Sequence, residues 1–162
     1  MKNPKISVIM STYNEPIKWL KESIDSILNQ TFGDFEFIII NDNPKRKDLQ
    51  VELEKYQKKD KRIKFIKNKK NLGLTKSLNQ GLKMAKGKYI ARMDADDISL
   101  NTRFEIQHNY LEKQSDIFLV GSGATFIDEK GNFLLKNIPP ITHKKIIERF
   151  KIKNCLLHPT IM

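Results

Sequence analysis

Cysteine and histidine are scarce in this sequence of 162 residues, which has one cysteine and three histidines. Cys155 alone cannot form a disulfide within the chain, and a single thiol suits a reducing compartment. The histidines are scattered along the sequence. No set of cysteine and histidine ligands therefore has the spacing of a zinc site.

Long apolar runs are also missing. No stretch approaches the roughly 20 apolar residues of a membrane-spanning helix, and no apolar segment of a secretory signal follows Met1–Pro4. We therefore expect a cytoplasmic protein. Hydrophobic residues make up 39% of the chain and charged residues 30%, which is typical of a globular protein with a real core. We expect residues 1–162 to form a single domain.

Acidic residues are few in the middle of the chain. The net charge is +11, and residues 44–88 contain 16 Lys and Arg against 4 Asp and Glu. Such a basic segment attracts phosphorylated ligands, anionic lipid or nucleic acid, or it is simply a solvated helix face. No recognition helix or aromatic RNA-binding platform accompanies it, so we expect no nucleic acid partner. Peripheral contact of this basic face with the inner face of a membrane stays open.

The hydrophobic pattern of the first hundred residues alternates between short buried strands and amphipathic helices. Strands are expected at 5–11, 35–40, 62–67 and 89–93, and helices at 17–30, around 49–56 and at 74–85. Leu74, Leu78, Leu82 and Ala85 form the buried stripe of the third helix, and Gly87 is expected to cap it. The alternation predicts an α/β fold with a parallel sheet and helices on both faces.

The pattern after residue 100 predicts a second, less regular part. Its expected elements are a helix at about 101–113 with Phe104, His108 and Leu111 inward, a buried strand at 117–120, a hairpin of 124–128 and 132–136, a helix at 142–151 capped by Thr142 with Ile146, Ile147 and Phe150 on one face, and a strand at 155–162.

Three carboxylates, Asp94, Asp96 and Asp97, follow the fourth strand directly. Like charges at this spacing are unfavourable unless a cation is shared between them. Oxygen ligands alone favour Mg²⁺ or Mn²⁺. Alternatively, these acids cap the helix that begins near Leu100 and complement its dipole.

Polar and aromatic residues follow every strand of the predicted sheet. They are Ser11, Thr12, Tyr13 and Glu15 after the first strand, Asp42 after the second, Asn71 and Gly73 after the third, and Asp94 and Asp96 after the fourth. Ligands of such sheets bind beyond the carboxyl ends of the strands. Because neither a glycine-rich dinucleotide fingerprint nor a Walker loop is present, a metal rather than a backbone nest would neutralise a diphosphate.

Three segments, Ile6–Glu15, Phe37–Asp42 and Asn71–Asp97, resemble the nucleotide-sugar-binding part of the GT-A glycosyltransferases of family 2. The resemblance implies a GT-A (Rossmann-like) fold with a small β-hairpin near the C-terminus. It also implies an inverting, metal-dependent transfer of sugar from a nucleoside diphosphate sugar, a UDP-sugar being favoured. The acceptor would be a saccharide or a lipid-linked saccharide in polysaccharide or glycoconjugate synthesis.

The resemblance assigns roles around the base of the nucleotide. Tyr13 would stack on the base, and Asp42 would accept a hydrogen bond from it. Ser11 and Glu15 would line the base and ribose. The alternatives are aromatic packing for Tyr13, an Asx-turn at residues 43–44 for Asp42, and a helix cap for Glu15.

The resemblance also assigns roles near the ribose and phosphates. Asn71 and Gly73 would approach the base, with Gly73 giving the backbone close access. Asp94 would hold the ribose side, and Asp96 would bind the metal, Mn²⁺ or Mg²⁺. Arg92 would pair with Asp94 or with Asp42. The pair would steady the acidic loop, or it would be a purely structural ion pair.

The sequence departs from the family pattern at several positions. Asn41 stands where many relatives have an acid, and Leu78 stands where many have an arginine, unless Lys76 replaces it. Asp97 is left to cap the next helix. The family's catalytic carboxylate is not recognisable before Met162, so we expect residues 1–162 to be the N-terminal part of a longer enzyme. His158 is either near the acceptor cleft or structural.

Two other functions stay open at this point. A sugar nucleotidyltransferase would need a glycine- and arginine-rich loop after the first strand, which Ser11–Glu15 does not supply. A non-catalytic, membrane-associated nucleotide-binding module would use the basic face alone.

Overall fold

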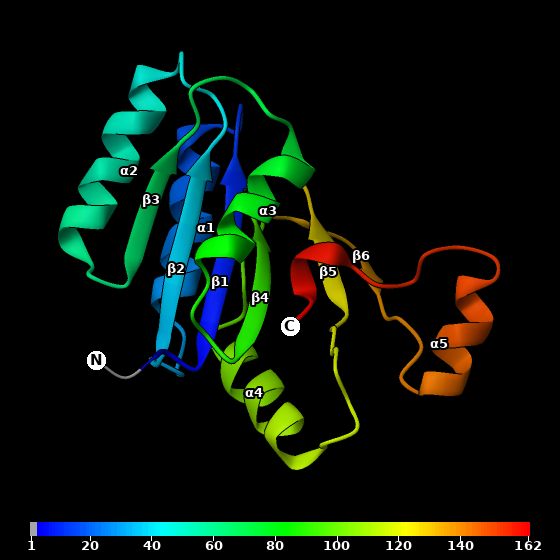
Figure 1. Cartoon of the computed structure of the whole chain (residues 1–162). Helices are drawn as coiled ribbons and strands as arrows, with labels where there is room; N and C mark the ends of the chain where they lie inside the picture. The colour runs from blue at the N-terminus through cyan, green and yellow to red at the C-terminus, as the bar shows by residue number, and fades with distance from the viewer. Residues whose placement is uncertain (1–2) are drawn as a thin grey trace.

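The computed structural model describes residues 3–162, which form two β-sheets (Figure 1). The larger sheet has the strand order β3-β2-β1-β4, and every neighbouring pair is parallel. Its strands are β1 (Ile6–Thr12), β2 (Phe35–Asn41), β3 (Ile63–Lys67) and β4 (Tyr89–Asp94). The smaller sheet is the antiparallel pair of β5 (Ala124–Ile127) and β6 (Phe133–Asn137). The parallel sheet and the hairpin expected from the sequence are confirmed.

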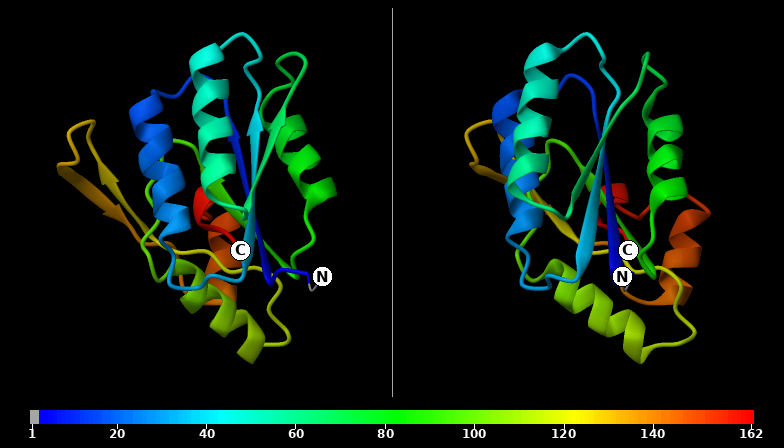
Figure 2. Two further views of the ribbon diagram at one scale, coloured as in Figure 1. Left: turned by 90° about the vertical axis from the view of Figure 1, so that its left-hand side faces the viewer. Right: turned by 60° about the vertical axis from the view of Figure 1, so that its left-hand side comes forward.

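Helices cover both faces of the parallel sheet. They are α1 (Ile17–Leu28), α2 (Lys47–Lys59), α3 (Leu74–Met84), α4 (Arg103–Lys113) and α5 (His143–Phe150), followed by the short 3₁₀ helix η1 (His158–Thr160). Figure 2 shows α1 and α2 on one side of the sheet and α3 on the other. In the described range no helix is long and apolar enough to cross a bilayer.

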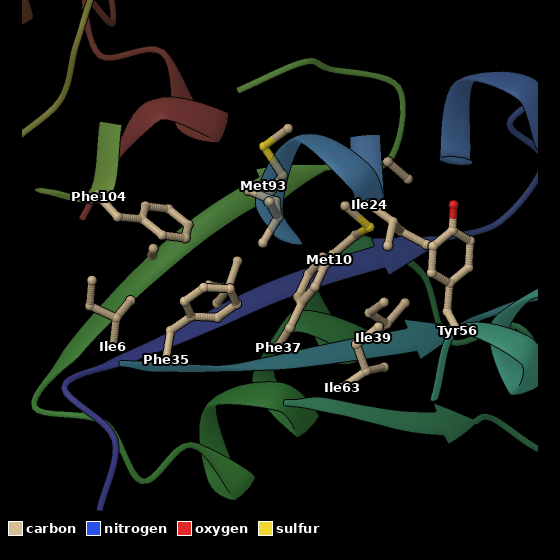
Figure 3. Close-up of a cluster of buried hydrophobic side chains, with 14 of the residues drawn as sticks. Ile6, Met10, Ile24, Phe35, Phe37, Ile39, Tyr56, Ile63, Met93 and Phe104 are labelled. Atoms are coloured by element: carbon tan, nitrogen blue, oxygen red, sulfur yellow. The ribbon is translucent and has the colours of Figure 1, made fainter. Parts of the chain in front are cut away.

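The main core lies between the sheet and the helices α1, α2 and α4 (Figure 3). Strand β1 is buried along its whole length because it is central and covered on both faces. Its residues Ile6, Val8 and Met10 face this core, where Phe35 and Phe104 meet edge to face with ring centroids 5.7 Å apart.

The opposite face of the sheet packs against α3 through Ile9, Ile38 and Ile40. The expected stripe of α3 is partly wrong, since Leu74 and Leu82 are exposed and the buried residues are Ser77 and Gly81. A β-carbon on Gly81 would lie 2.6 Å from Cγ2 of Ile9. Small side chains therefore let α3 approach the sheet closely. Leu78 and Ala85 of the expected stripe pack against the sheet, whereas Leu74 and Leu82 do not.

The expectation that Gly87 caps α3 is also wrong. The helix ends at Met84 with Ala85 as its C-cap, and Gly87 does not have a positive φ. Its backbone instead lies against β1, where an added β-carbon would be 2.5 Å from the amide nitrogen of Ser7. The glycine is needed because two backbones approach each other here.

A buried carboxylate, Glu36, stabilises the same end of the sheet. It accepts hydrogen bonds from the Ser7 hydroxyl at 2.6 Å and from the Lys86 amide at 2.7 Å, and it pairs with Lys64. Burial raises the pKa of Glu36, but these hydrogen bonds and the Lys64 ammonium outweigh burial and hold the pKa below its usual value.

The last third of the chain corrects two further expectations. Residues 117–120 form no strand, and Phe118 is 93% exposed. Only Val120 is paired there, through two backbone hydrogen bonds with Met162 of 2.8 and 2.9 Å. Residues 155–162 contain η1 rather than a strand, and the Ile161 carbonyl accepts from the Arg92 amide at the edge of β4. The segment near Met162 therefore pairs with Val120 on one side and with Arg92 on the other, and single pairs of this kind do not form a strand.

Helix α5 forms where the sequence predicts it. The Thr142 hydroxyl accepts from the Lys145 amide at 3.5 Å, which confirms Thr142 as the N-cap. None of its residues is buried, so the apolar side chains Ile147 and Phe150 remain largely exposed.

Candidate nucleotide and metal site

Strand register brings three predicted site residues to one face at the carboxyl edge of the sheet. Ser11 of β1 lies beside Asp94 of β4. Ser11 comes two residues after Ile9, whose side chain faces α3. Because side chains alternate between faces along a strand, Ser11, Asp94 and the Asp42 carboxylate that follows β2 share the α3 face. This is the convergence that the sequence predicts at that edge.

Asp42 is the most firmly held of these acids. It is 2% exposed, and its carboxylate accepts hydrogen bonds from Nδ2 of Asn68 at 2.7 Å and from the amides of Leu72 and Gly73, both at 2.8 Å. Burial raises the pKa of Asp42, but these donors outweigh it, so the pKa lies below the usual value. The carboxylate thus fixes the loop between β3 and α3.

The Asx-turn that was the alternative role for Asp42 is made by its neighbour. The amide of Asn43 donates to Oδ1 of Asn41 at 2.8 Å, which closes the turn. The side chain of Asp42 is directed to the other loop instead, so that alternative is wrong.

Gly73 is the N-cap of α3 and has a φ of 81°, in the left-handed region that favours glycine. Its amide donates to Oδ2 of Asp42. The neighbouring Asn71 is exposed and makes no side-chain hydrogen bond with residues 3–162. The structure therefore places a free amide side chain and a glycine with positive φ together at the loop that follows β3.

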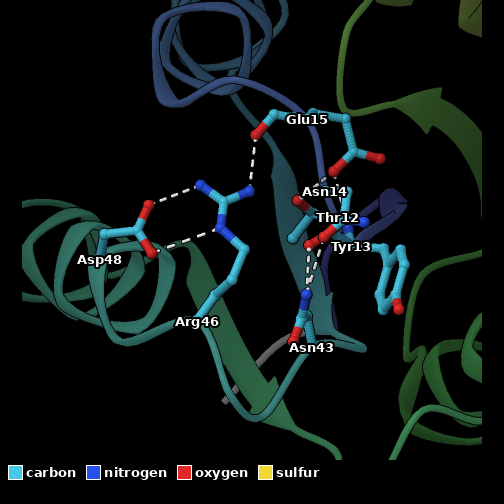
Figure 4. Close-up of polar contacts among 7 residues, drawn as sticks. All are labelled: Thr12, Tyr13, Asn14, Glu15, Asn43, Arg46 and Asp48. Carbon is cyan, nitrogen blue, oxygen red and sulfur yellow. Dashed lines mark hydrogen bonds and ion pairs between the residues drawn. The ribbon is translucent and has the colours of Figure 1, made fainter.

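The loop after β1 is ordered by Glu15 (Figure 4). Its carboxylate accepts from the Thr12 hydroxyl and from the Tyr13 amide, both at 2.7 Å. The Glu15 carboxylate therefore accepts hydrogen bonds from residues that precede it in the loop and not from amides of α1, whose N-cap is Pro16. The helix-cap alternative is wrong. The Arg46 guanidinium, paired with Asp48, donates to the Glu15 carbonyl at 2.8 Å.

Tyr13 is presented by this loop. Its carbonyl accepts from Nδ2 of Asn43 at 3.2 Å, and its side chain is 42% exposed (Figure 4). A tyrosine with a fixed backbone and an exposed ring is available to a flat ligand.

Asp96 and Asp97 of the acidic loop after β4 have no ion-pair partner among the described residues. Burial, followed by the neighbouring carboxylate of Asp94, raises the pKa of Asp96. Burial, followed by the carboxylates of Asp94 and Asp96, raises the pKa of Asp97 to about 6. Helix α4 begins only at Arg103, with Thr102 as its N-cap, so the helix-capping interpretation of this cluster, including Asp97, is wrong.

The donor set of this loop fits a hard divalent cation, because it offers carboxylate oxygens whose mutual repulsion a cation would relieve. Within residues 3–162, no group of three or more His, Cys, Asp or Glu is arranged to hold a metal ion by itself. A cation at Asp96 would therefore need ligands from a second molecule, as the oxygens of a diphosphate are.

Arg92 pairs with Asp94, as one of the two expected partners. It is 5% exposed, and its Nε has no hydrogen-bond partner among the described residues. Arg103 donates to the Arg92 carbonyl at 2.8 Å.

His158 lies in a groove of about 400 Å³ between α3 and β4 that Arg92 also lines. Burial, followed by the charge of Arg92, lowers the pKa of His158.

Sequence reasoning missed the residues that hold the site in place. Asn68 links Asp42 to the Ser77 hydroxyl of α3, at 3.0 Å, and Ser23 of α1 donates to the Asp94 carbonyl at 2.7 Å. Asn68 directly follows β3, so the rule that found the other strand-end residues also points to it. Ser23 carries no local signal, because its partner is 71 residues away.

A parallel sheet covered on both faces, with acids and an exposed aromatic ring at its carboxyl edge, defines an α/β domain of the nucleotide-binding type. The model of a known family, Glycosyl transferase family 2, matches residues 7–162. The chain belongs to glycosyl transferase family 2.

Individual relatives agree. An uncharacterized glycosyltransferase of Methanocaldococcus jannaschii is 51% identical over 100% of this chain and 56% of its own length. The O-antigen biosynthesis glycosyltransferase WbnJ of Escherichia coli is 41% identical over 97% of this chain and 60% of its own length. The chain therefore spans little more than half the length of these curated relatives.

Solved structures show the same fold. TarS of S. aureus, also solved with UDP and with UDP-GlcNAc, superposes on 68% of this chain and 33% of its own with a TM-score of 0.61 and 29% identity. The mannosyltransferase PcManGT of Pyrobaculum calidifontis, solved with GDP-Man and Mn²⁺, covers 75% of this chain and 36% of its own with a TM-score of 0.64. At 19% identity, PcManGT supports the fold alone. The expected GT-A fold is confirmed.

Proposed function

We propose that this chain is the donor-binding part of a metal-dependent, inverting glycosyltransferase that takes sugar from a nucleoside diphosphate sugar. The observation that carries the proposal is the convergence of Ser11, Asp42 and Asp94 on one face of the sheet beside the repelling acids of the β4 loop. Family membership and the nucleotide complexes of TarS support the donor class, with a UDP-sugar favoured.

The base would bind between Tyr13 and Asp42. The exposed ring of Tyr13 offers a stacking surface on a backbone that Glu15 holds fixed. Oδ2 of Asp42 accepts one hydrogen bond, from Gly73, and keeps a lone pair for a base N–H. Asn71 and the Gly73 backbone would approach the same base from the opposite loop.

The ribose and diphosphate would lie along the β4 loop. Asp94, held by its pair with Arg92, would accept from ribose hydroxyls. Asp96 would hold Mn²⁺ or Mg²⁺ together with diphosphate oxygens. Bound there, the cation would supply charge stabilisation for the departing diphosphate. The pair of Arg92 with Asp94 keeps a cationic side chain close to the same oxygens.

We place the general base that deprotonates the acceptor hydroxyl outside residues 1–162, in the remainder of a longer enzyme.

The acceptor would be a saccharide or a lipid-linked saccharide in polysaccharide or glycoconjugate synthesis. The exposed lysines of α2, which include Lys55, Lys58 and Lys59, give a basic face suited to contact with an anionic membrane.

Isothermal titration calorimetry with UDP, GDP and dTDP, each with and without Mn²⁺, tests this function. We expect Mn²⁺-dependent binding of nucleoside diphosphate, tightest for UDP. Adenosine diphosphate serves as the control nucleotide. Absence of binding by all three in the presence of Mn²⁺ would overturn the proposal.

A further inference from the structure

A cavity of about 410 Å³ adjoins the acidic loop after β4, and neither Tyr13 nor Asp42 lines it. It is enclosed by the first turns of α1, the loop after β4 and the tip of the β5–β6 hairpin. Its lining includes Trp19, Ile98 and Ile127, four carboxylates of which Asp96 is one, and the two lysines Lys18 and Lys130. Asp96 is thus shared between the proposed metal site and this cavity, while the other lining residues belong to neither the base nor the phosphate site.

The hairpin wall of the cavity is ordered by its own hydrogen bonds. The Asp128 carboxylate accepts from the amides of Lys130 at 2.9 Å and Asn132 at 2.8 Å. Nδ2 of Asn132 donates to the same carboxylate at 2.9 Å, and Gly131 takes the positive φ of 85° that the turn requires. The turn therefore fixes the backbone from which Ile127 and Glu129 project.

The lining combines one large aromatic surface with charged groups. Trp19 is half-buried, and with Ile98 and Ile127 it forms the apolar part of the wall. Glu22, Glu129 and Asp96 supply hydrogen-bond acceptors at the edges. A cavity of this volume is within the range of small-ligand sites, which place a few polar groups around apolar and aromatic surface.

This lining matches a sugar ring better than other ligands. A pyranose presents one face of C–H groups, which suits an aromatic side chain, and a rim of hydroxyl donors, which suits carboxylates. A purely apolar ligand would leave the carboxylates desolvated and unpaired. A second nucleotide would bring its phosphates toward four carboxylates, which outnumber the two lysines of the lining.

We propose that the Trp19 cavity binds a sugar ring beside the reacting centre, with Trp19 as the stacking surface and Glu22 and Glu129 as hydroxyl acceptors. The inference rests on the proposed function, because the cavity adjoins that site through Asp96. The ring has two sources, the sugar of the donor or a sugar of the acceptor. Both have the same chemistry, and the experiment separates them.

Trp19 is the one tryptophan of the sequence, so its fluorescence reports this cavity alone. The full chain with Mn²⁺ is titrated with UDP, GDP, UDP-GlcNAc, UDP-galactose, UDP-glucose and GDP-mannose. The free methyl glycosides of the same four sugars are titrated separately. If the donor's sugar binds there, a nucleotide sugar shifts the emission beyond the shift caused by its bare nucleotide. If an acceptor sugar binds there, a methyl glycoside shifts the emission without nucleotide.

Variants then test whether stacking is responsible. Calorimetry should show a fivefold or greater loss of sugar-dependent affinity in Trp19→Ala and near wild-type affinity in Trp19→Phe. Both variants should bind the bare nucleotide with Mn²⁺ as the wild type does, which also shows that they fold. Glu129→Ala, at the exposed hairpin tip, should weaken the sugar-dependent affinity without affecting the bare nucleotide.

Two results would be decisive against the inference. If none of the four sugars, free or nucleotide-linked, changes Trp19 emission while UDP or GDP binds with Mn²⁺, the sugar-binding cavity is wrong and the proposed function stands. Equal sugar-dependent affinity in Trp19→Ala and wild type would overturn it in the same way. Failure of every nucleotide to bind would instead count against the proposed function, and the methyl glycosides would still test the cavity.

Discussion

Asp42 and Asn68 are 26 residues apart in sequence, and Nδ2 of Asn68 donates to Oδ1 of Asp42 at 2.7 Å in the buried interior of the site. The same nitrogen donates to the Ser77 hydroxyl at 3.0 Å. One amide group therefore joins the end of β2, the end of β3 and the first turns of α3. The loop that would contact the base depends on this link.

Replacing Asn68 by alanine tests that dependence. Removing the amide leaves Oδ1 of Asp42 with one donor in a buried position, so we expect a loss of about 1–3 kcal/mol in the free energy of unfolding. UDP affinity should fall as well, because the loop before α3 loses its anchor. Urea denaturation and calorimetry measure the two effects. Asn71→Ala, on the same loop but exposed, is the control for stability and should leave it unchanged within about 0.5 kcal/mol.

Tyr13 provides a prediction that concerns binding alone. Stacking on a base contributes about 1–3 kcal/mol, so Tyr13→Ala should weaken UDP binding by that amount while Tyr13→Phe keeps most of it. The half-exposed side chain makes no core contact, so the melting temperature should not change. Tyr110→Ala, which removes an exposed tyrosine of α4 toward the other end of the sheet, is the matched control (Figure 1). Equal UDP affinity in Tyr13→Ala and wild type would remove Tyr13 from the site.

Glu36 gives a dependence of stability on pH. Its pKa in the folded protein is below that of the unfolded chain, so ionised Glu36 stabilises the fold above pH of about 4.3. This contribution is lost as the pH falls through the folded-state pKa. Glu36→Gln should lower the free energy of unfolding at pH 7 by about 1–3 kcal/mol. It should also reduce the slope of stability against pH between 5 and 3, roughly the range of carboxylate titration. Denaturation of both proteins across that range measures the slope, and identical slopes would contradict the account.

Gly87 and Gly33 form a matched pair for close packing. A β-carbon at Gly87 would lie 2.5 Å from the Ser7 amide nitrogen, whereas one at Gly33 would meet nothing within 4 Å. We expect Gly87→Ala to destabilise the protein by about 1–3 kcal/mol. Gly33→Ala should be neutral or stabilising by up to about 1 kcal/mol, because it restricts the unfolded chain. Thermal melts of the two variants should therefore shift in different directions or by clearly different amounts.

The sequence predicted the parallel sheet because burial in its central strands is a local property. It is readable from Ile6–Met10, an apolar run that only Ser7 interrupts. The prediction failed for segments whose structure depends on the residues they pair with or pack against. Residues 117–120 have the composition of a strand, but in the described chain the backbone of Val120 pairs with Met162 alone. Leu82 appeared buried by periodicity, yet Gly81 makes the contact with Ile9 because a small residue permits a closer approach.

The candidate site divides in the same way. The strand-end rule located Ser11, Asp42 and Asp94, since parallel strands place their carboxyl ends at one edge. It could not supply the partners of Asp42, which come from 26 to 31 residues further along the chain. It also could not reveal that Glu15 holds the Tyr13 loop rather than α1, because both arrangements use the same local spacing.

The most direct test of the central claim is the effect of Mn²⁺ on the affinity for UDP in the wild type and in Asp96→Ala, measured by calorimetry. We predict that Mn²⁺ raises the affinity of the wild type by roughly tenfold or more and that Asp96→Ala loses this increase. Asp34→Ala, an exposed acid that precedes β2, should keep the increase. An equal Mn²⁺-dependent gain in Asp96→Ala and in the wild type would contradict the assignment of the metal to the β4 loop.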